Sequence, residues 1–440
     1  MPADAPPVVA PHRGLRRALA PFRHPAYRRL AVALVFSTFA SGVWAVAIVW
    51  DVIRFGGGPG QLSVVAAAGT LGVLIPALLG GVVADRVPQK LVLLCVAGAE
   101  TVGMALAAVL AAGDRTGVVS LAAISFVLGV AMAFYYPAYS AWLPALVPAE
   151  ELQAVNGFEG MVRPGVHQAI GPAVAGAVVA ALNPAAAMTV AAVASGLGLL
   201  ALTSVPRTAL RRAVDGGHTV SAVFRDLREA VRYLFRTPWL LATLLFASLM
   251  ILVMMGPLEV LIPFLIKDTL GGGARDHSYV LAAFGVGGAA GSFAMAARRM
   301  PRRYLSVMIL LWGLACLPFA LIATTRHIAV LVGCGLVMGV MFGAPQVIWG
   351  TLLQRRVPPE LLGRVSSLDF FVSISLMPAS MALAGPVSHA IGLRNTFLIA
   401  AFAPPVFAVA AVLLARLPAD EVAHPLDDVA GPAQARAASA

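Results

Sequence analysis

The stretch Val147-Pro148-Ala149-Glu150-Glu151-Leu152 recurs as Val357-Pro358-Pro359-Glu360-Leu361-Leu362, 210 residues further along the 440-residue chain. Three more short matches occur along the chain, in the same order in both halves and at offsets of 210 to 214 residues. They pair Phe22-Arg23-His24-Pro25 with Phe235-Arg236-Thr237-Pro238, Gly81 with Gly291, and Gly171-Pro172 with Gly385-Pro386. Four ordered matches at a nearly constant offset indicate that the chain consists of two duplicated halves.

Both halves are built of long apolar runs. Hydrophobic residues make up 60% of the chain and charged residues 12%, whereas a soluble protein carries about 25% charged residues. A helix needs ~20 apolar residues to cross a bilayer, and twelve segments reach that length. They lie near 30–54, 61–84, 91–112, 117–140, 155–181, 184–205, 239–266, 278–298, 304–324, 327–350, 366–390 and 395–416. This pattern excludes a secreted disulfide scaffold, extended disorder and a typical cytosolic enzyme. It predicts an all-α integral membrane protein with twelve transmembrane helices in two pseudo-symmetric six-helix lobes.

The polar stretches divide the chain further. We expect a basic N-terminal arm at 1–29, lobes at 30–205 and 239–416, a linker at 206–238 and a disordered tail at 417–440. The linker carries apolar residues at spacings of three and four from Val220 to Phe235, with arginines between them. This pattern predicts a basic amphipathic helix that lies in the membrane interface. A regulatory binding segment is the alternative.

The basic residues predict the orientation. Of the 31 Lys and Arg residues, 25 fall on the side of the N-terminus and six on the other side. Basic residues favour cytoplasmic loops, so we expect a multi-pass protein of a bacterial inner membrane with both termini in the cytoplasm. The formal charge of +11 then follows from topology, and no nucleic-acid partner is expected.

A charged loop, Gly81-Val82-Val83-Ala84-Asp85-Arg86-Val87-Pro88-Gln89-Lys90, follows the second apolar run. Its glycine permits close approach of another helix, and its basic residues hold the turn on the cytoplasmic side. With this loop the chain resembles the major facilitator superfamily, whose hallmark reads G-x-x-x-D-R-x-G-R-R/K. Within it the chain is similar to the drug:proton antiporter branch of enterobactin exporters, macrolide-efflux proteins and mycobacterial multidrug exporters.

The resemblance implies a conformational latch between the halves, formed by Gly81, Asp85, Arg86 and Lys90. Pro88 replaces the family's glycine, and Met295 stands in the second half where the first has Asp85. One latch is therefore expected, not two. The resemblance also extends to the fifth helix, where Gly171, Pro172 and Gly176 match part of the family's antiporter motif. Small residues at this spacing predict a helix-packing site.

Acidic residues inside apolar runs are functional candidates, because burying a charge mid-membrane costs on the order of 2.5–3.5 kcal/mol. Glu259 lies between Pro257 and Pro263 and is the first candidate for proton coupling. A structural hydrogen bond to a neighbouring helix is the alternative. Asp51 is the second candidate, on one helical face with Ser41 and Trp44, although it can also pair with Arg54 at the outer interface.

Aromatic and polar side chains share faces on two further helices. Tyr135 and Tyr139 do so near 117–140, and Phe342, Gln346 and Trp349 near 327–350. The resemblance implies that helices one, four, seven and ten line the substrate cavity, so these residues, with Ser41 and Trp44, are cavity candidates. Aromatic faces near an acid suit lipophilic, often cationic compounds. Ordinary helix packing is the alternative.

Several chemistries are absent from the sequence. There is no GxxxxGK[ST] or HExxH, and the three cysteines show no metal-ligand spacing. We therefore expect no enzyme, no catalytic residue, no metal and no cofactor. The expected function is a monomeric secondary transporter that exports small amphipathic compounds by proton antiport, with substrate, protons and the lipid bilayer as partners. The alternatives are a dedicated siderophore or metabolite exporter, an importer, and a non-transporting sensor or scaffold.

Overall fold

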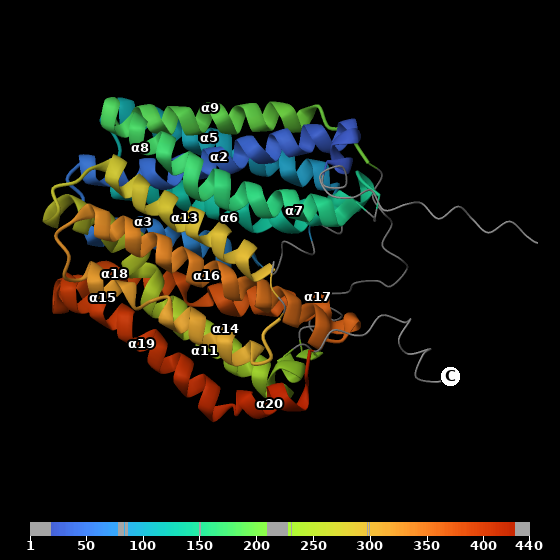
Figure 1. Cartoon of the computed structure of the whole chain (residues 1–440). Helices are drawn as coiled ribbons and strands as arrows, with labels where there is room; N and C mark the ends of the chain where they lie inside the picture. Colours follow the sequence, from blue (N-terminus) through green and yellow to red (C-terminus); the bar gives the residue numbers. More distant parts are fainter. Residues whose placement is uncertain are drawn as a thin grey trace, which may run out of the picture.

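The computed structural model describes residues 19–77, 83, 87–148, 151–208, 228–229, 231–296, 298 and 300–426. Within these ranges the chain is helical and has no strand. Figure 1 shows long helices lying roughly side by side, with the first half of the chain in one group and the second half in the other. The predicted fold class is confirmed.

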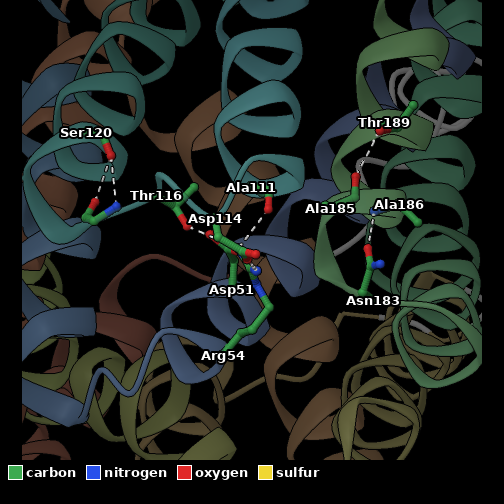
Figure 2. Close-up of polar contacts among 11 residues, drawn as sticks. Asp51, Arg54, Ala111, Asp114, Thr116, Ser120, Asn183, Ala185, Ala186 and Thr189 are labelled. Carbon is green, nitrogen blue, oxygen red and sulfur yellow. Dashed lines mark hydrogen bonds and ion pairs between the residues drawn. The ribbon is translucent and has the colours of Figure 1, made fainter.

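The first lobe begins with a 3₁₀ turn and continues with helices joined by short loops. Its elements are η1 (Ala20–Arg23), α2 (Pro25–Arg54), α3 (Pro59–Leu74), α5 (Gln89–Ala112), α6 (Val118–Trp142), η2 (Leu143–Ala145), α7 (Leu152–Val162), η4 (Arg163–Ile170), α8 (Gly171–Ala181) and α9 (Pro184–Thr203). Proline stands at the first position of several helices, where its missing N–H has no intrahelical partner to lose. The side chain of Asn183 caps α9 by accepting the N–H of Ala186 at 2.8 Å (Figure 2).

The second lobe repeats this order. Its elements are α11 (Pro238–Gly256), η5 (Pro257–Leu261), α12 (Ile262–Phe264), η6 (Leu265–Thr269), α13 (Ala274–Ala296), α14 (Tyr304–Leu314), α15 (Pro318–Ile322), α16 (Ile328–Arg356), α17 (Pro359–Ser375), α18 (Met377–Ile391), α19 (Leu393–Leu414) and α20 (Leu417–Ala423). In the described part of the chain, ten helical spans are long and apolar enough to cross a membrane. The shorter α3 and the composite α7–η4–α8 occupy the predicted second and fifth segments.

Two transmembrane segments contain wider π-helical turns. Pro164 lies in η4 and Pro257 begins η5. Proline cannot donate a backbone hydrogen bond, and its ring clashes with the carbonyl four residues earlier. The helix widens locally to relieve that clash, and such turns are frequent at functional sites. Glu259, the first candidate acid, lies inside η5.

Glycines allow helices to pack closely in equivalent places of the two lobes. Gly72 of α3 lies against the backbone of α6, and Gly287 and Gly291 of α13 lie against the backbone of α16. A β-carbon at any of these positions would overlap the opposing backbone. The Gly287-x-x-x-Gly291 spacing is that of a helix-packing motif.

The two lobes meet where α3 packs on α18 and where α8 and η4 pack on α13. The amide of Gly385 donates to the Ser63 hydroxyl at 2.8 Å, and a β-carbon on Gly385 would lie 2.6 Å from the Cα of Gly60. Residues 60 and 63 follow the loop that joins α2 to α3. This end of the bundle, opposite the end at which α17 and α20 lie in Figure 1, is therefore closed by direct lobe-to-lobe contact.

The structure corrects two predicted boundaries. The first helix begins at Pro25, ahead of the apolar run predicted from near residue 30, and Phe22 of the preceding η1 packs on the rings of Tyr27 and Phe158. The predicted disordered tail contains α20, where Leu417 is buried and Glu421 accepts bonds from the amide and hydroxyl of Ser306. Composition misled here because these few residues have specific partners on the lobe.

Much of the predicted amphipathic helix lies outside the described residues. Residues 228–229 and 231–236 are helical. Among them Leu234 is buried, whereas Phe235 is exposed. The hydroxyl of Tyr233 donates to the carbonyl of Arg356 at 3.4 Å, which ties this segment to α16. Its interfacial role stays a prediction.

Candidate functional site

Three of the four latch residues, Gly81, Asp85 and Arg86, lie outside the described residues. Lys90 is described, and its ammonium donates to the carbonyl of Thr203 at 2.7 Å and to that of Val205. These carbonyls lie at the end of α9 and just beyond it, where backbone acceptors lack helical partners and a cation is favoured. In this conformation Lys90 caps a helix of its own lobe. The latch role stays a prediction.

Asp51 forms an ion pair in the structure. Its carboxylate is fully buried and accepts from Arg54 at 2.9 Å. Arg54 also donates to the carbonyl of Ala111 at 3.0 Å, to Thr116 at 3.2 Å, and to Asp114 (Figure 2). The cluster ties the end of α2 to the loop between α5 and α6. This is the arrangement that the second interpretation of Asp51 predicts, and it gives the residue a structural partner.

Removing this arginine should destabilise the fold. Arg54→Ala leaves the Asp51 carboxylate buried without a counter-ion. We expect the free energy of unfolding to fall by roughly 2–3 kcal/mol. This is less than the loss expected for a fully buried ion pair, because Arg54 is partly exposed. The midpoint of thermal unfolding in detergent measures it. Arg326→Ala, at an exposed arginine, is the control and should change little, whereas adding Asp51→Asn to Arg54→Ala should recover part of the loss. Equal midpoints for Arg54→Ala and wild type would contradict this account.

Glu259 contrasts with Asp51, because its side chain is exposed and makes no hydrogen bond or ion pair to any described residue. Its neighbours Pro257, Val260 and Leu261 are buried. The segment η5 contacts α18 of its own lobe and α3 of the other. The structural hydrogen bond to a neighbouring helix, which the alternative interpretation predicts, is therefore not formed with any described residue.

The aromatic candidates divide into buried and accessible groups. Tyr139 is fully buried and stacks on Tyr135 at 5.7 Å between ring centres. Both line a small cavity inside the first lobe, together with Ser37 and Glu100. The hydroxyl of Ser37 donates to Glu100 at 3.2 Å. Tyr139 thus belongs to the interior of one lobe and does not face the space between the lobes.

The candidates on α16 divide in the same way. Trp349 is buried, with its ring edge-to-face on Trp239. Phe342 is half-buried beside Phe284, and Gln346 is exposed. On α2, Ser41 and Trp44 are half-buried. Helix packing therefore explains Tyr139 and Trp349, while Phe342, Gln346, Ser41 and Trp44 keep accessible surface.

The glycine motif of helix five lies at two contacts. Gly171 and Pro172 are buried, and a β-carbon on Gly171 would lie 2.8 Å from the Cα of Gly42 on α2. A β-carbon on Gly176 would lie 2.7 Å from the Cβ of Ser278 and 2.8 Å from the carbonyl oxygen of Ala274, both on α13. Gly171 therefore packs α8 against α2 of its own lobe, and Gly176 packs α8 against α13 of the other lobe.

The sequence analysis missed two acids, Glu159 of α7 and Asp369 of α17. Both lie within transmembrane segments, and Glu159 is buried. The indole N–H of Trp349 donates to Asp369 at 3.1 Å, and Glu159 lies 3.9 Å from Arg163. The two acids are 210 residues apart, which is the repeat offset. Extending the repeat to chemically similar residues would have found them.

Residues 16–437 match the profile of the family described as transmembrane secretion effector. The chain belongs to this family of the major facilitator superfamily. This family member is 30% identical over 413 residues to the multidrug efflux pump Tap of Mycobacterium tuberculosis, with 90% of this chain and 94% of the pump covered. It is 26% identical to macrolide efflux protein A of Streptococcus pyogenes, with 77% and 84% covered.

Solved transporters share the fold. The nucleoside transporter NupG superposes with a TM-score of 0.64 at 14% identity, covering 88% of this chain and 98% of NupG. A POT family transporter in complex with 5-aminolevulinic acid gives a TM-score of 0.67 at 12% identity, with 88% and 96% covered. At such identities the likeness concerns the fold alone.

Proposed function

We propose that the chain is an efflux transporter that exports small amphipathic compounds, many of them cationic, by proton antiport across the inner membrane. The observation that carries this proposal is the match to a multidrug efflux pump over 90% of the chain. A second, more distant match to a macrolide efflux protein supports the same class of substrate. The accessible aromatic residues Trp44 and Phe342 suit stacking with such compounds.

Alternating access is the proposed mechanism. Two repeats with a site between them can rock so that the site opens to one side and then the other. Glycine contacts hold the lobes together at the end that carries the α2–α3 loop. With both termini in the cytoplasm, as the basic residues predict, this closed end faces the periplasm. The conformation described is then the one that receives substrate from the cytoplasm.

Glu259 is the proposed coupling acid. The residue is exposed and has no partner among the described residues, so its carboxylate is available to a proton or to a cationic substrate. It lies in η5, which touches α3 of the other lobe. Motion between the lobes changes how much water reaches it, and protonation therefore favours the two conformations to different extents. Asp51, held by Arg54, is the secondary candidate.

Expression in a host without its own drug efflux tests the proposal. We expect energised cells to extrude ethidium, a cationic dye, faster than cells with an empty vector, and to tolerate more of it. Collapsing the proton gradient with an ionophore should remove the difference. Net dye uptake would indicate an importer, and equal traces in both strains would favour a sensor or scaffold; either result would contradict the proposal.

A further inference from the structure

The duplicated halves place an acid at the same repeat position in each lobe. Glu159 and Asp369 are 210 residues apart. The aromatic residues beside them, Tyr139 and Trp349, have the same offset. So do the residues one turn after each acid, Arg163 and Ser373. Each lobe therefore carries an acid, an aromatic residue with a polar hydrogen and a polar residue at i+4.

The second-lobe copy is fully paired. Oδ2 of Asp369 accepts the indole N–H of Trp349 at 3.1 Å. Oδ1 accepts the hydroxyl of Ser373 at 3.3 Å. Each carboxylate oxygen thus has a donor, and the indole hydrogen has an acceptor. Nothing further is needed to complete this site.

The first-lobe copy is incomplete. Glu159 is 8% exposed, and its Oε1 is buried without any hydrogen-bond partner. Its Oε2 lies 3.9 Å from Nη2 of Arg163, beyond hydrogen-bond distance, and that nitrogen is also buried without a partner. The buried hydroxyl of Tyr139 faces the Glu159 carboxylate without reaching good hydrogen-bond geometry, and the buried hydroxyl of Tyr27 nearby has no partner either.

Buried polar atoms are nearly always hydrogen-bonded, so four groups without well-formed bonds in one place indicate that this conformation leaves the cluster unsatisfied. An ionised carboxylate only accepts hydrogen bonds, whereas a protonated one also donates. A proton on Oε1 of Glu159 would supply a donor for a tyrosine oxygen and neutralise a charge that Arg163, at 3.9 Å, only partly offsets. Among the described residues, the titratable groups that face Glu159 are Tyr27 of α2, Tyr135 and Tyr139 of α6, and the guanidinium of Arg163.

The site reaches the surface of the bundle and contacts the other lobe. Arg163 and Tyr136 are 38% and 57% exposed, and the guanidinium lies 5.5 Å from the ring centre of Tyr136. Arg163 also begins η4, which packs on α13. A β-carbon on Gly285 of α13 would lie 2.8 Å from the Cβ of Gln168 in η4. Movement of the second lobe therefore displaces the segment that carries Arg163.

We propose that Glu159 is a proton-binding site of the first lobe and that Arg163 is the counter-ion that replaces the proton. Uptake forms one O–H bond at Oε1 with a proton from water, and release returns that proton to water. When η4 moves with the lobes, Arg163 approaches or leaves the carboxylate and exchanges with the proton. The proposal rests on the proposed proton antiport and adds a second protonation site, in the other lobe from Glu259.

Infrared difference spectra of the purified protein test protonation without transport. On acidification, wild type and Asp369→Asn should gain the band of a protonated carboxyl group that Glu159→Gln lacks. Glu159→Asp should retain a shifted band, which shows that any loss in the glutamine variant reflects the carboxyl group and not misfolding. An identical band in Glu159→Gln and wild type would overturn the proposal.

Ethidium transport in proteoliposomes tests the coupling role. With an imposed pH gradient, Glu159→Gln should fall to the level of empty liposomes yet retain exchange of dye without a gradient. The symmetry-matched Asp369→Asn should keep both activities. Gradient-driven uptake by Glu159→Gln at the wild-type rate would overturn the inference and leave antiport standing. If dye uptake by the wild type does not depend on the pH gradient, the proposal of proton antiport is contradicted. The infrared result then still decides whether Glu159 binds a proton.

Discussion

Leucine in place of Gly176 is expected to abolish transport while the protein still folds and inserts. In the closed conformation a β-carbon at this position would lie 2.7 Å from the Cβ of Ser278 and 2.8 Å from a backbone oxygen of α13. A backbone atom cannot move aside cheaply, and a leucine is larger still. The lobes would have to separate at this end, so the variant should stay away from the conformation that receives substrate. Dye efflux from energised cells measures the loss.

The matched control for Gly176→Leu is Gly98→Leu, because a β-carbon on Gly98 of α5 meets nothing within 4 Å. Ser63→Cys provides a direct report of closure, since Ser63 is 1% exposed at the contact with Gly385. A membrane-impermeant maleimide should label the Ser63→Cys variant faster when it also carries Gly176→Leu than when it carries Gly98→Leu. Normal efflux with unchanged labelling in Gly176→Leu would show that this contact does not control access.

Glutamine in place of Glu259 is expected to separate substrate movement from the proton gradient. The amide resembles a protonated carboxyl group in shape but cannot release a proton. Accumulation of ethidium against its gradient should be lost, whereas exchange of dye between the two sides should persist. The rate of exchange should also lose the pH dependence that Glu259 contributes. Both are measured in proteoliposomes with and without an imposed pH gradient.

Asp268→Asn is the control for Glu259→Gln. Asp268 lies in the same transmembrane span, near its end, where it is exposed and 3.7 Å from Lys267. Loss of this surface charge should leave gradient-driven accumulation intact. Full accumulation by Glu259→Gln would remove Glu259 from the coupling mechanism. Equal loss in both variants would indicate a general effect of charge at this end of the helix.

Much of the fold could be predicted because it depends on segment length and repetition. An apolar run of about twenty residues crosses a bilayer as an α-helix, because the helix satisfies its backbone hydrogen bonds internally. The repeat at a 210-residue offset then divides the helices into two lobes. Prolines such as Pro25 and Pro238 lie at helix starts, where the sequence pattern also places them. Boundaries such as the tail failed because Leu417 and Glu421 have partners that composition does not record.

The site was less predictable, because the spacing of residues along a helix shows which of them share a face but not which other helix covers that face. Tyr139 and Trp349 share faces with other candidates, yet both are buried within their own lobes. Asp51 could be placed beside Arg54 from sequence spacing, and the structure shows that pair. Glu159 was overlooked because its significance comes from unpaired neighbours on other helices, such as Tyr27 and Tyr139, which only the folded structure brings together.

Simultaneous recording of dye and proton movement in proteoliposomes tests the central claim most directly. Vesicles with an acidic lumen and a trapped pH indicator would receive ethidium from outside. The account predicts that wild type accumulates the dye while the lumen becomes more alkaline, and that Glu259→Gln and empty vesicles show neither change. Accumulation that persists at the same rate after an ionophore collapses the gradient would contradict proton antiport.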